Sequence, residues 1–265
     1  MKLFISFCKQ QYYSLTAYRT SFWMTIFNTF IRIYAYSMLW MALYRQNSSV
    51  FGVGLSQMLI YSTASIALSQ AFTWWSGPHI YVESYVKNGK IILDLLKPVD
   101  FEHLLFFRGL SETLINFCFY TIPTFLLASI ILKVKIFNSL MQLLLFMIAV
   151  SLGYLILFLL NYLLALLSFV TLDLDGYLHA YHGIIAFCSG QVVPLWLYPS
   201  MLRKIIDVLP FKGVFYIPLS VLIGDIKGIE FVNAVFYQIF WIFILFIIGR
   251  IAWNSILKKI VIQGG

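Results

Sequence analysis

The sequence is poor in charge, poor in cysteine and free of nucleotide-binding motifs. Only 11% of its 265 residues are charged, while 62% are hydrophobic. That balance excludes an ordinary soluble domain, in which about 25% of residues are charged. Cys8, Cys118 and Cys188 lie far apart, which excludes a zinc-type spacing and an even-numbered disulfide framework. We therefore expect three reduced, packed thiols.

The chain also lacks the glycine-rich loops that bind phosphates. GxxxxGK[ST] and GxGxxG are both absent, and Gly89–Lys90 has neither the upstream glycine nor the following Ser or Thr of a phosphate loop. If the protein uses nucleotide energy, we expect the nucleotide to bind another chain. We expect no cleavable signal peptide, because Lys9 stops the first apolar run too early.

Long apolar runs dominate what is present. Continuous runs of about 20 apolar residues are typical of membrane-spanning helices, whereas the strands of a membrane barrel alternate over about 10 residues. The sequence therefore predicts an all-α integral membrane protein with one domain over 1–265. Pro123 should kink the third span, and Trp74–Trp75 suits an interfacial belt. The predicted spans are 21–43, 55–75, 113–132, 140–167, 177–197 and 232–251.

Two shorter segments predict helices that lie along the membrane surface. Residues 1–19 gather Phe4, Cys8, Tyr12 and Leu15 on one helical face. Residues 199–210, bounded by two prolines, place apolar side chains opposite Arg203, Lys204 and Asp207. His179, His182, Gly190, Gln191 and Pro194 interrupt the apolar segment before it, so we expect no straight, uniform fifth helix.

The excess of basic residues sets the expected orientation. A net charge of +8 would suggest nucleic acid in a soluble protein, but in a membrane protein Lys and Arg flank the spans, so we expect no nucleic-acid binding. Six spans put both termini on one side. That side carries ten Lys and Arg against seven on the other, which predicts cytoplasmic termini and an outward-facing 199–230 segment.

The most polar stretch of the chain, 83–100, falls on the predicted cytoplasmic side. Asn88–Gly89 predicts a turn within it. After the turn, charges recur among Ile91, Ile92, Leu93 and Leu95, which suits a short amphipathic helix. We interpret 83–98 as the place where a soluble partner contacts the membrane part. The residues assigned to this contact are Glu83, Lys87, Asn88, Gly89, Lys90, Ile91, Ile92, Asp94 and Leu95.

Few polar groups lie inside the predicted spans. Arg32 stands near the middle of the first span, where a charge costs about 2.5–3.5 kcal/mol on insertion scales. It could face cargo or a partner helix, or it could snorkel or hydrogen-bond within the bundle. The candidate translocation-path residues are Arg32, Gln57, Asn116 and Gln191. Such amides also serve as hydrogen bonds between helices.

Two further clusters raise other chemistries. Asp173, Asp175, His179 and His182 lie within ten residues, which allows a metal site but equally a polar loop with Asp175 as a helix cap. Asp94 and Asp100 suggest a membrane enzyme that acts on lipid-linked substrates through magnesium. Their spacing is wider than such sites use, so we assign no catalytic residue and no metal to this chain.

Three stretches carry a family resemblance: IILDLLKPVDF (91–101), SGQVVPLWLYPSMLRKIIDVLPF (189–211) with YIPLSVLIG (216–224), and the ending VIQGG. Together they resemble the permease subunits of type-2 ATP-binding-cassette (ABC) exporters, in the branch called ABC-2 family transporter permeases. The resemblance covers the whole chain.

The resemblance implies an N-terminal interfacial helix, six spans, a cytoplasmic coupling helix over 83–98 and re-entrant helices on the outer side before the last span. It also implies separate ATPase subunits that hold ATP and magnesium, a second permease, identical or homologous, and a bacterial plasma membrane. The implied function is ATP-driven export of a peptide, lipid or drug. Two alternatives remain: a self-contained secondary transporter or channel, and a membrane enzyme that acts on lipid-linked substrates.

Overall fold

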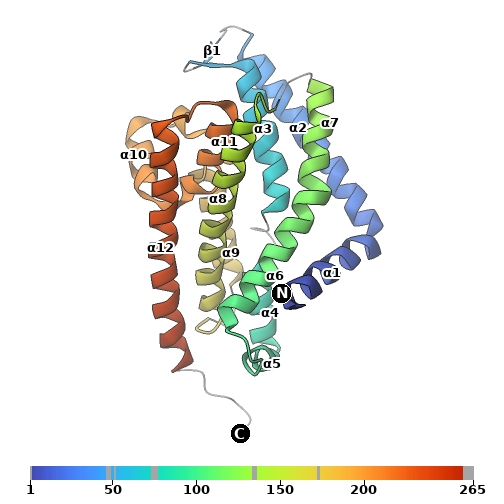
Figure 1. The fold of residues 1–265 in the computed structure, drawn as a ribbon, viewed down its shortest axis with the longest axis vertical. Helices are drawn as coiled ribbons and strands as arrows, with labels where there is room; N and C mark the ends of the chain where they lie inside the picture. The colour runs from blue at the N-terminus through green and yellow to red at the C-terminus, as the bar shows by residue number, and fades with distance from the viewer. Residues whose placement is uncertain are drawn as a thin grey trace.

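The computed structural model describes residues 2–45, 49–50, 52–72, 77–132, 136–171 and 174–258. Over these residues the chain is almost entirely helical, and the long helices run along the longest axis of the molecule (Figure 1). The all-α prediction is confirmed except for a two-residue antiparallel hairpin, in which β1 (Ser49–Val50) pairs with β2 (Val53–Gly54). The sequence predicted only a loop there.

Short connections join most of the helices. In chain order they are α1 (Lys2–Ala17), α2 (Arg19–Leu43), α3 (Leu55–Ala71), α4 (Pro78–Lys87), α5 (Ile91–Leu95), α6 (Phe101–Asn116), the π-helical turn η1 (Phe117–Thr121), α7 (Ile122–Leu132), α8 (Leu140–Leu167), α9 (Asp175–Cys188), the 3₁₀ turn η2 (Leu195–Leu197), α10 (Ser200–Val208), the 3₁₀ turn η3 (Pro210–Gly213), α11 (Tyr216–Ile223) and α12 (Ile229–Leu257).

Among the described residues, three continuous helices are long and apolar enough to cross a membrane: Phe101–Leu132, Leu140–Leu167 and Ile229–Leu257. The second has the predicted bounds, and the third extends the predicted 232–251. The other predicted spans correspond to α2, α3 and α9, and α9 has only 14 residues. At 1.5 Å per residue it is about 21 Å long, shorter than the ~30 Å hydrocarbon core. Six spans therefore stay a prediction, and Trp74–Trp75 lies outside the described residues.

The third predicted span, 113–132, is the second part of one unbroken helix from Phe101 to Leu132. Arg108 and Glu112 lie in its first part, and the point at which this helix enters the membrane stays a prediction. Its one irregular turn, η1, lies directly before Pro123. Proline has no amide N–H and its ring crowds the carbonyl four residues back, and a wider π turn relieves both. The expected irregularity is thus a π turn inside one long helix.

The fifth predicted span is not one straight helix, as its polar interruptions predicted, and after α9 the chain folds back into the bundle. α9 ends at Cys188, and Gly190 then adopts a φ of +78°, a region that favours glycine. The amphipathic α10 follows at the predicted place. α11 was missed by the pattern analysis: Ile217 to Ile223 are all buried, so the segment has no polar face to reveal a helical period.

Glycine lets the returning segment pack closely on the central helix α8. A β-carbon at Gly153 of α8 would lie 2.9 Å from the carbonyl oxygens of Gly213 and Val214. The bundle core lies around this contact and includes Phe72, Phe146 and Phe215. α11 packs against α8 and α3, and α12 packs along α8.

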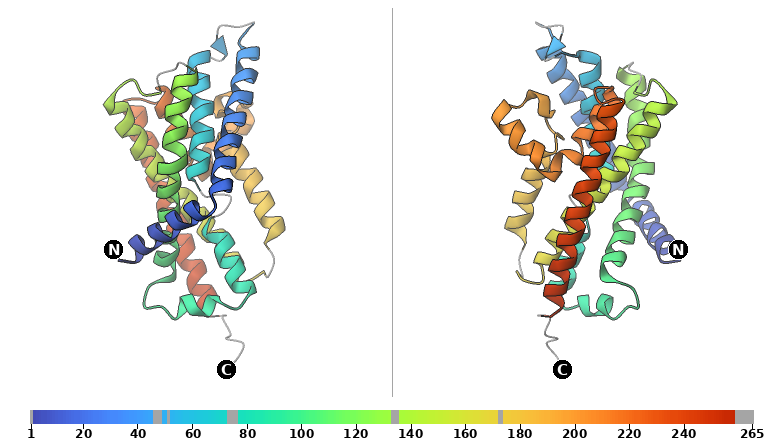
Figure 2. Two further views of the ribbon diagram at one scale, coloured as in Figure 1. Left: turned by 90° about the vertical axis from the view of Figure 1, so that its right-hand side faces the viewer. Right: turned by 60° about the vertical axis from the view of Figure 1, so that its left-hand side comes forward.

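At the other end of the sequence, α1 and α2 are separate helices joined at Tyr18, as predicted for an interfacial helix followed by a span. α1 crosses the direction of α2 at a steep angle (Figure 2) and packs on α6. Phe4 contacts Phe107 with ring centroids 6.2 Å apart. Its position in a membrane interface stays a prediction.

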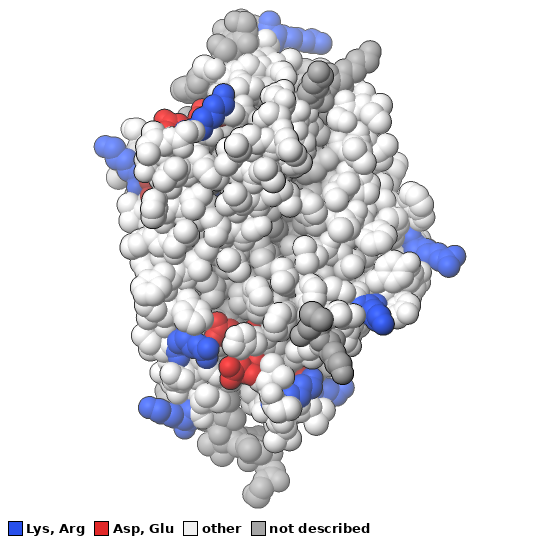
Figure 3. Space-filling view, in the orientation of Figure 1, with Lys and Arg blue, Asp and Glu red and all other residues white. Residues whose placement is uncertain are grey.

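Charged side chains gather toward the two ends of the molecule. On the face shown in Figure 3, most Lys, Arg, Asp and Glu lie near the top and toward the lower end, and basic side chains at the right edge stand nearer mid-height. α4, α5 and the C-terminal end of α12 are at one end, while β1 and α10 are toward the other (Figure 1). This distribution matches a bundle whose middle sits in lipid.

Candidate functional site

Residues 77–100, which include the polar stretch 83–100, fold into a compact element at the lower end of the bundle (Figure 1). Pro78 occupies the first turn of α4, where its missing N–H costs nothing, and Gly77 precedes it as N-cap. The predicted turn at Asn88–Gly89 is present, with Gly89 at a φ of +68°. α4 begins at Pro78, five residues before the predicted element 83–98.

A buried carboxylate ties the two short helices together. The Tyr81 hydroxyl of α4 donates to Asp94 Oδ2 of α5 at 2.5 Å, and Lys97 Nζ donates to Asp94 Oδ1 at 2.6 Å. Asp94 is only 2% exposed. The Arg108 guanidinium of α6 lies 3.7 Å from the centre of the Tyr81 ring, a cation–π contact. These contacts brace α4, α5 and α6 as one unit.

A second buried carboxylate joins the element to the start of α9. Glu83 Oε1 accepts a hydrogen bond from the Leu174 amide at 3.1 Å and pairs with Lys87 at 2.9 Å. Leu174 is the N-cap of α9. Glu83 therefore accepts a hydrogen bond from a helix-terminal N–H that has no partner within the helix. This bond therefore joins the element directly to the start of α9.

His79, which the sequence analysis did not single out, is completely buried at the same junction. Its ring lies 6.1 Å, centroid to centroid, from both Tyr181 and His182 of α9. Within the described residues neither ring nitrogen has a hydrogen-bond partner. Burial, and to a lesser degree His182, lower the pKa of His79 to about 3. A neutral imidazole therefore fills the joint between α4 and α9.

The outward surface of the element differs from the predicted contact set. Lys87, Asn88, Gly89 and Lys90 are exposed, and Leu93 and Leu96 are exposed by 63% and 76%. Ile91 is buried in the bundle core and Leu95 packs against it.

The burial divides the predicted contact residues into two groups. Glu83, Asp94 and Ile91 are positioned to hold the element in shape, because their side chains face the bundle. Lys87, Lys90 and, half-buried, Ile92 remain accessible to a partner. The exposed apolar residues are Leu93 and Leu96, which the predicted contact residues did not include. Their roles in binding stay predictions.

Beside the element, a hollow of about 500 Å³ opens between residues 95–101 and the end of α12. Phe101 stacks on Trp253 at its wall, with ring centroids 4.8 Å apart. Arg250 of α12 pairs with Glu102 of α6 at 3.3 Å. The hollow is lined by Leu95 and Lys97, on either side of the exposed Leu96 in the chain.

The four candidate path residues occupy different environments. Gln57 lies at the start of α3, where it caps the Gly54 amide at 3.2 Å and donates to the Ile223 carbonyl at 3.2 Å. Asn116 is 9% exposed on α6. The Gln191 carbonyl accepts a bond from Ser65 at 2.5 Å. Arg32 is exposed on α2. The bonds of Gln57 fit the helix-to-helix interpretation.

The acidic and histidine clusters do not form a joint metal site in the described part of the chain, where no group of three candidate ligands comes together. Asp173 lies outside the described residues, His179 is exposed and His182 is buried. α9 begins at Asp175 with Leu174 as its N-cap, so Asp175 is not the cap. Asp94 is internally paired, while Asp100 is exposed and 3.2 Å from His103.

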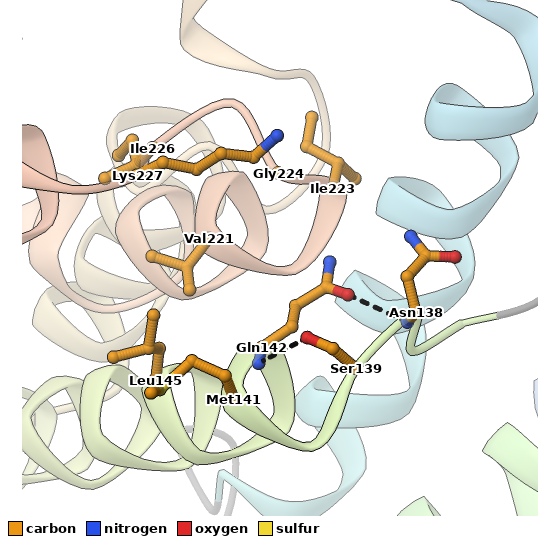
Figure 4. Close-up of a pocket in the computed structure, with 10 residues that line it drawn as sticks. All are labelled: Asn138, Ser139, Met141, Gln142, Leu145, Val221, Ile223, Gly224, Ile226 and Lys227. Carbon is orange, nitrogen blue, oxygen red and sulfur yellow. Dashed lines mark hydrogen bonds between the residues drawn. The ribbon is translucent and has the colours of Figure 1, made fainter.

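A second cavity, of about 320 Å³ (Figure 4), lies toward the end of the bundle opposite α5 (Figure 1). Its walls come from the start of α8 and the loop after α11. Ser139 caps the Gln142 amide at 3.1 Å, and Gln142 Oε1 accepts from the Asn138 amide at 2.8 Å. Lys227 reaches across Gly224. The sequence did not suggest this site, because its walls are some eighty residues apart in the chain.

Residues 15–264 match the family model described as ABC-2 family transporter protein. The comparison with curated proteins finds no match.

Proposed function

The chain belongs to the ABC-2 family of transporter proteins, and from this premise we propose that its α4–α5 element is the joint through which an ATPase drives transport. The family makes the chain a membrane permease of an ABC transporter, a component whose ATPase partner is a separate subunit. A permease without its own motor needs a surface that receives mechanical work. The element at the lower end is the surface best built for that purpose.

One observation carries the proposal: the element is braced on its inner side and open on its outer side. Inside, Asp94 bonds to Tyr81 and Lys97, and Glu83 bonds to Leu174. Outside, Lys90, Leu93 and Leu96 are exposed. An element that transmits a conformational change must be held firmly to the transmembrane helices and remain accessible to the ATPase. This arrangement meets both needs.

The bond from Glu83 to Leu174 gives the motion a route. ATP-driven closure of the partner displaces α4, and α4 carries the start of α9 with it. α9 leads through Gly190 to α10 at the other end of the bundle. The coupling requires that the partner contact differ between its open and closed states, because equal contact in both states shifts no equilibrium.

The finer assignment places six spans, α2, α3, α6–α7, α8, α9 with its return segment, and α12, in the plasma membrane of a bacterium. Both termini lie in the cytoplasm with α4–α5, and α1 lies in the interface. The cargo is an amphipathic or hydrophobic peptide, lipid or drug that leaves the cell. A second permease, identical or homologous, completes the path.

Two observations weigh against the alternatives. A secondary transporter needs ionisable groups inside the membrane for ion coupling, and Arg32 is almost the only such group in the predicted spans. A lipid-linked enzyme needs paired carboxylates, and Asp94 and Asp100 differ in exposure and partners.

The test is capture of the ATPase. The tagged full-length chain, purified from its native host, should retain an ATP-binding-cassette ATPase. Lys90→Glu combined with Leu93→Asp should abolish retention and leave the melting temperature within about 2 °C, because both side chains are exposed. Lys204→Glu on exposed α10, at the opposite end, is the matched control and should retain the ATPase. Equal retention by both variants would refute the assignment of α4–α5, and no ATPase on the unmodified chain would refute the proposed function itself.

A further inference from the structure

Arg32 is a charged residue within a predicted membrane span, so it needs a polar or anionic partner. It stands near the middle of α2, roughly 18 Å from either end of the helix, and its side chain is exposed. The buried face of α2 consists of Thr29, Ile33, Ser37 and Trp40. Arg32 lies beside that face, so it points out of the chain rather than into it.

Within the described residues, no hydrogen bond, ion pair or aromatic contact engages Arg32. Other arginines are engaged: Arg108 lies on Tyr81, Arg250 pairs with Glu102, and Arg203 is 4.0 Å from Asp207. Placing a guanidinium in contact with lipid tails costs free energy, so charged groups within spans face cavities or pair with a partner.

Among the described residues, the helices that pack against α2 offer Arg32 no acidic partner, because α1, α3 and α7 contain no Asp or Glu. α2 and α8 contain none either, and in α12 the only one is Glu230 in the first turn. A second identical copy in the same orientation in the membrane has its acidic residues in the same positions, so it offers Arg32 no acidic partner from these helices either. The ten acidic residues are Glu83, Asp94, Asp100, Glu102, Glu112, Asp173, Asp175, Asp207, Asp225 and Glu230.

We propose that Arg32, assisted by Asn28, binds the anionic headgroup of a lipid-like cargo as it passes along α2. This rests on the proposed transport function and narrows its cargo to amphiphiles with a phosphate or carboxylate. The planar guanidinium donates two parallel hydrogen bonds to either anion. Asn28 is exposed one helical turn earlier, on the same flank, where its amide adds a donor.

The rest of the exposed surface of α2 suits the apolar part of such a molecule. Trp23, Phe27 and Tyr34 are exposed by 66%, 62% and 64%. They lie on the opposite flank of the helix from Arg32. α2 therefore offers one polar contact near mid-depth and a broad aromatic surface, the pattern expected for an amphiphile rather than for a fully charged solute.

The experiment measures headgroup selectivity of the purified full-length chain. The chain in non-ionic detergent is offered equal amounts of phosphatidylglycerol and phosphatidylcholine, and native mass spectrometry counts the first lipid retained. We expect phosphatidylglycerol to be preferred, and Arg32→Gln to reduce that preference about tenfold or more, the loss expected for one charge-assisted hydrogen-bonded contact. Arg32→Lys keeps the charge but not the paired donors, so it should retain an intermediate preference. Arg45→Gln, an exposed cation just beyond the end of α2, is the matched control and should change it by less than twofold.

A parallel arm replaces phosphatidylglycerol with oleate, which tells a phosphate preference from a carboxylate preference; selectivity in either arm supports the proposal. Equal lipid preference in the unmodified chain and Arg32→Gln would overturn it. A second outcome would also overturn it: Arg32→Gln is no longer monodisperse, Arg32→Lys is monodisperse again, and neither variant prefers one lipid. Arg32 would then pair with another protein. An unmodified chain that captures its ATPase while lipid selectivity is absent refutes this inference alone.

Discussion

The Glu83 carboxylate accepts a hydrogen bond from the Leu174 amide across 3.1 Å and thereby joins two segments 91 residues apart. Glu83 is 7% exposed. One end of the bond lies in the element assigned to ATPase contact, and the other caps α9, which leads to the opposite end of the bundle. The proposed coupling between α4 and α9 depends on this bond.

The first prediction concerns this bond. Glu83→Ala leaves the buried Leu174 amide without an acceptor, which costs about 1–3 kcal/mol. We expect a lower melting temperature, unchanged ATPase capture, and ATP hydrolysis that no longer drives cargo movement. Thermal unfolding in detergent and paired hydrolysis and transport assays in proteoliposomes measure the three effects.

Two controls separate the Leu174 bond from the ion pair. Glu83→Gln keeps an acceptor oxygen and should retain most of the coupling. Lys87→Gln removes only the partner in a pair whose lysine is 42% exposed, and such pairs contribute little. If Lys87→Gln uncouples as strongly as Glu83→Ala, the assigned route through Leu174 is wrong.

The second prediction concerns pH. The folded-state pKa of His79 is about 3, because burial disfavours the imidazolium and His182 adds repulsion, while an unfolded chain has a pKa of about 6.5. The stability that depends on neutral His79 is therefore complete above about pH 6.5 and falls as the pH drops toward 3, because the unfolded chain takes up the proton first. Melting temperatures between pH 7.5 and 5 should decline.

His79→Phe should flatten that decline, since a buried apolar ring has no proton to bind. His179, on α9, is exposed, so His179→Gln should keep the slope of the unmodified protein. A slope that persists in His79→Phe would assign the pH dependence to other groups.

The third prediction concerns the close contact between α8 and the returning segment. An alanine at Gly153 places its β-carbon 2.9 Å from two backbone carbonyl oxygens, and backbone there has little freedom to move away. We expect Gly153→Ala to lower the free energy of unfolding by about 1–3 kcal/mol, the usual cost of overpacking.

Gly183, within α9, provides the comparison, because nothing lies within 4 Å of its would-be β-carbon. Gly183→Ala should be neutral or stabilise by up to about 1 kcal/mol through helix propensity. Thermal unfolding of both variants in the same detergent measures the difference, and a Gly153→Ala protein as stable as Gly183→Ala would contradict the close packing.

Patterns along the chain determined much of this protein. Runs of apolar residues fixed where α8 and α12 lie, since lipid-facing helices need continuous apolarity. Asn88–Gly89 marked the turn between α4 and α5, because few other residue pairs adopt that backbone. The stretches at 91–101 and 189–211 carried the resemblance that the family match confirms.

Only the tertiary structure decided which side of each element faces inward. The predicted contact set contained Asp94 and left out Leu93, yet Asp94 is buried because Tyr81 and Lys97 satisfy its charge, while Leu93 is exposed. α11 escaped detection because it is buried on every side and so has no periodic pattern. The bond between Glu83 and Leu174 joins distant segments, and no local rule contains such a contact. Hydropathy acts locally along a chain, whereas burial and pairing depend on what the folded chain brings alongside.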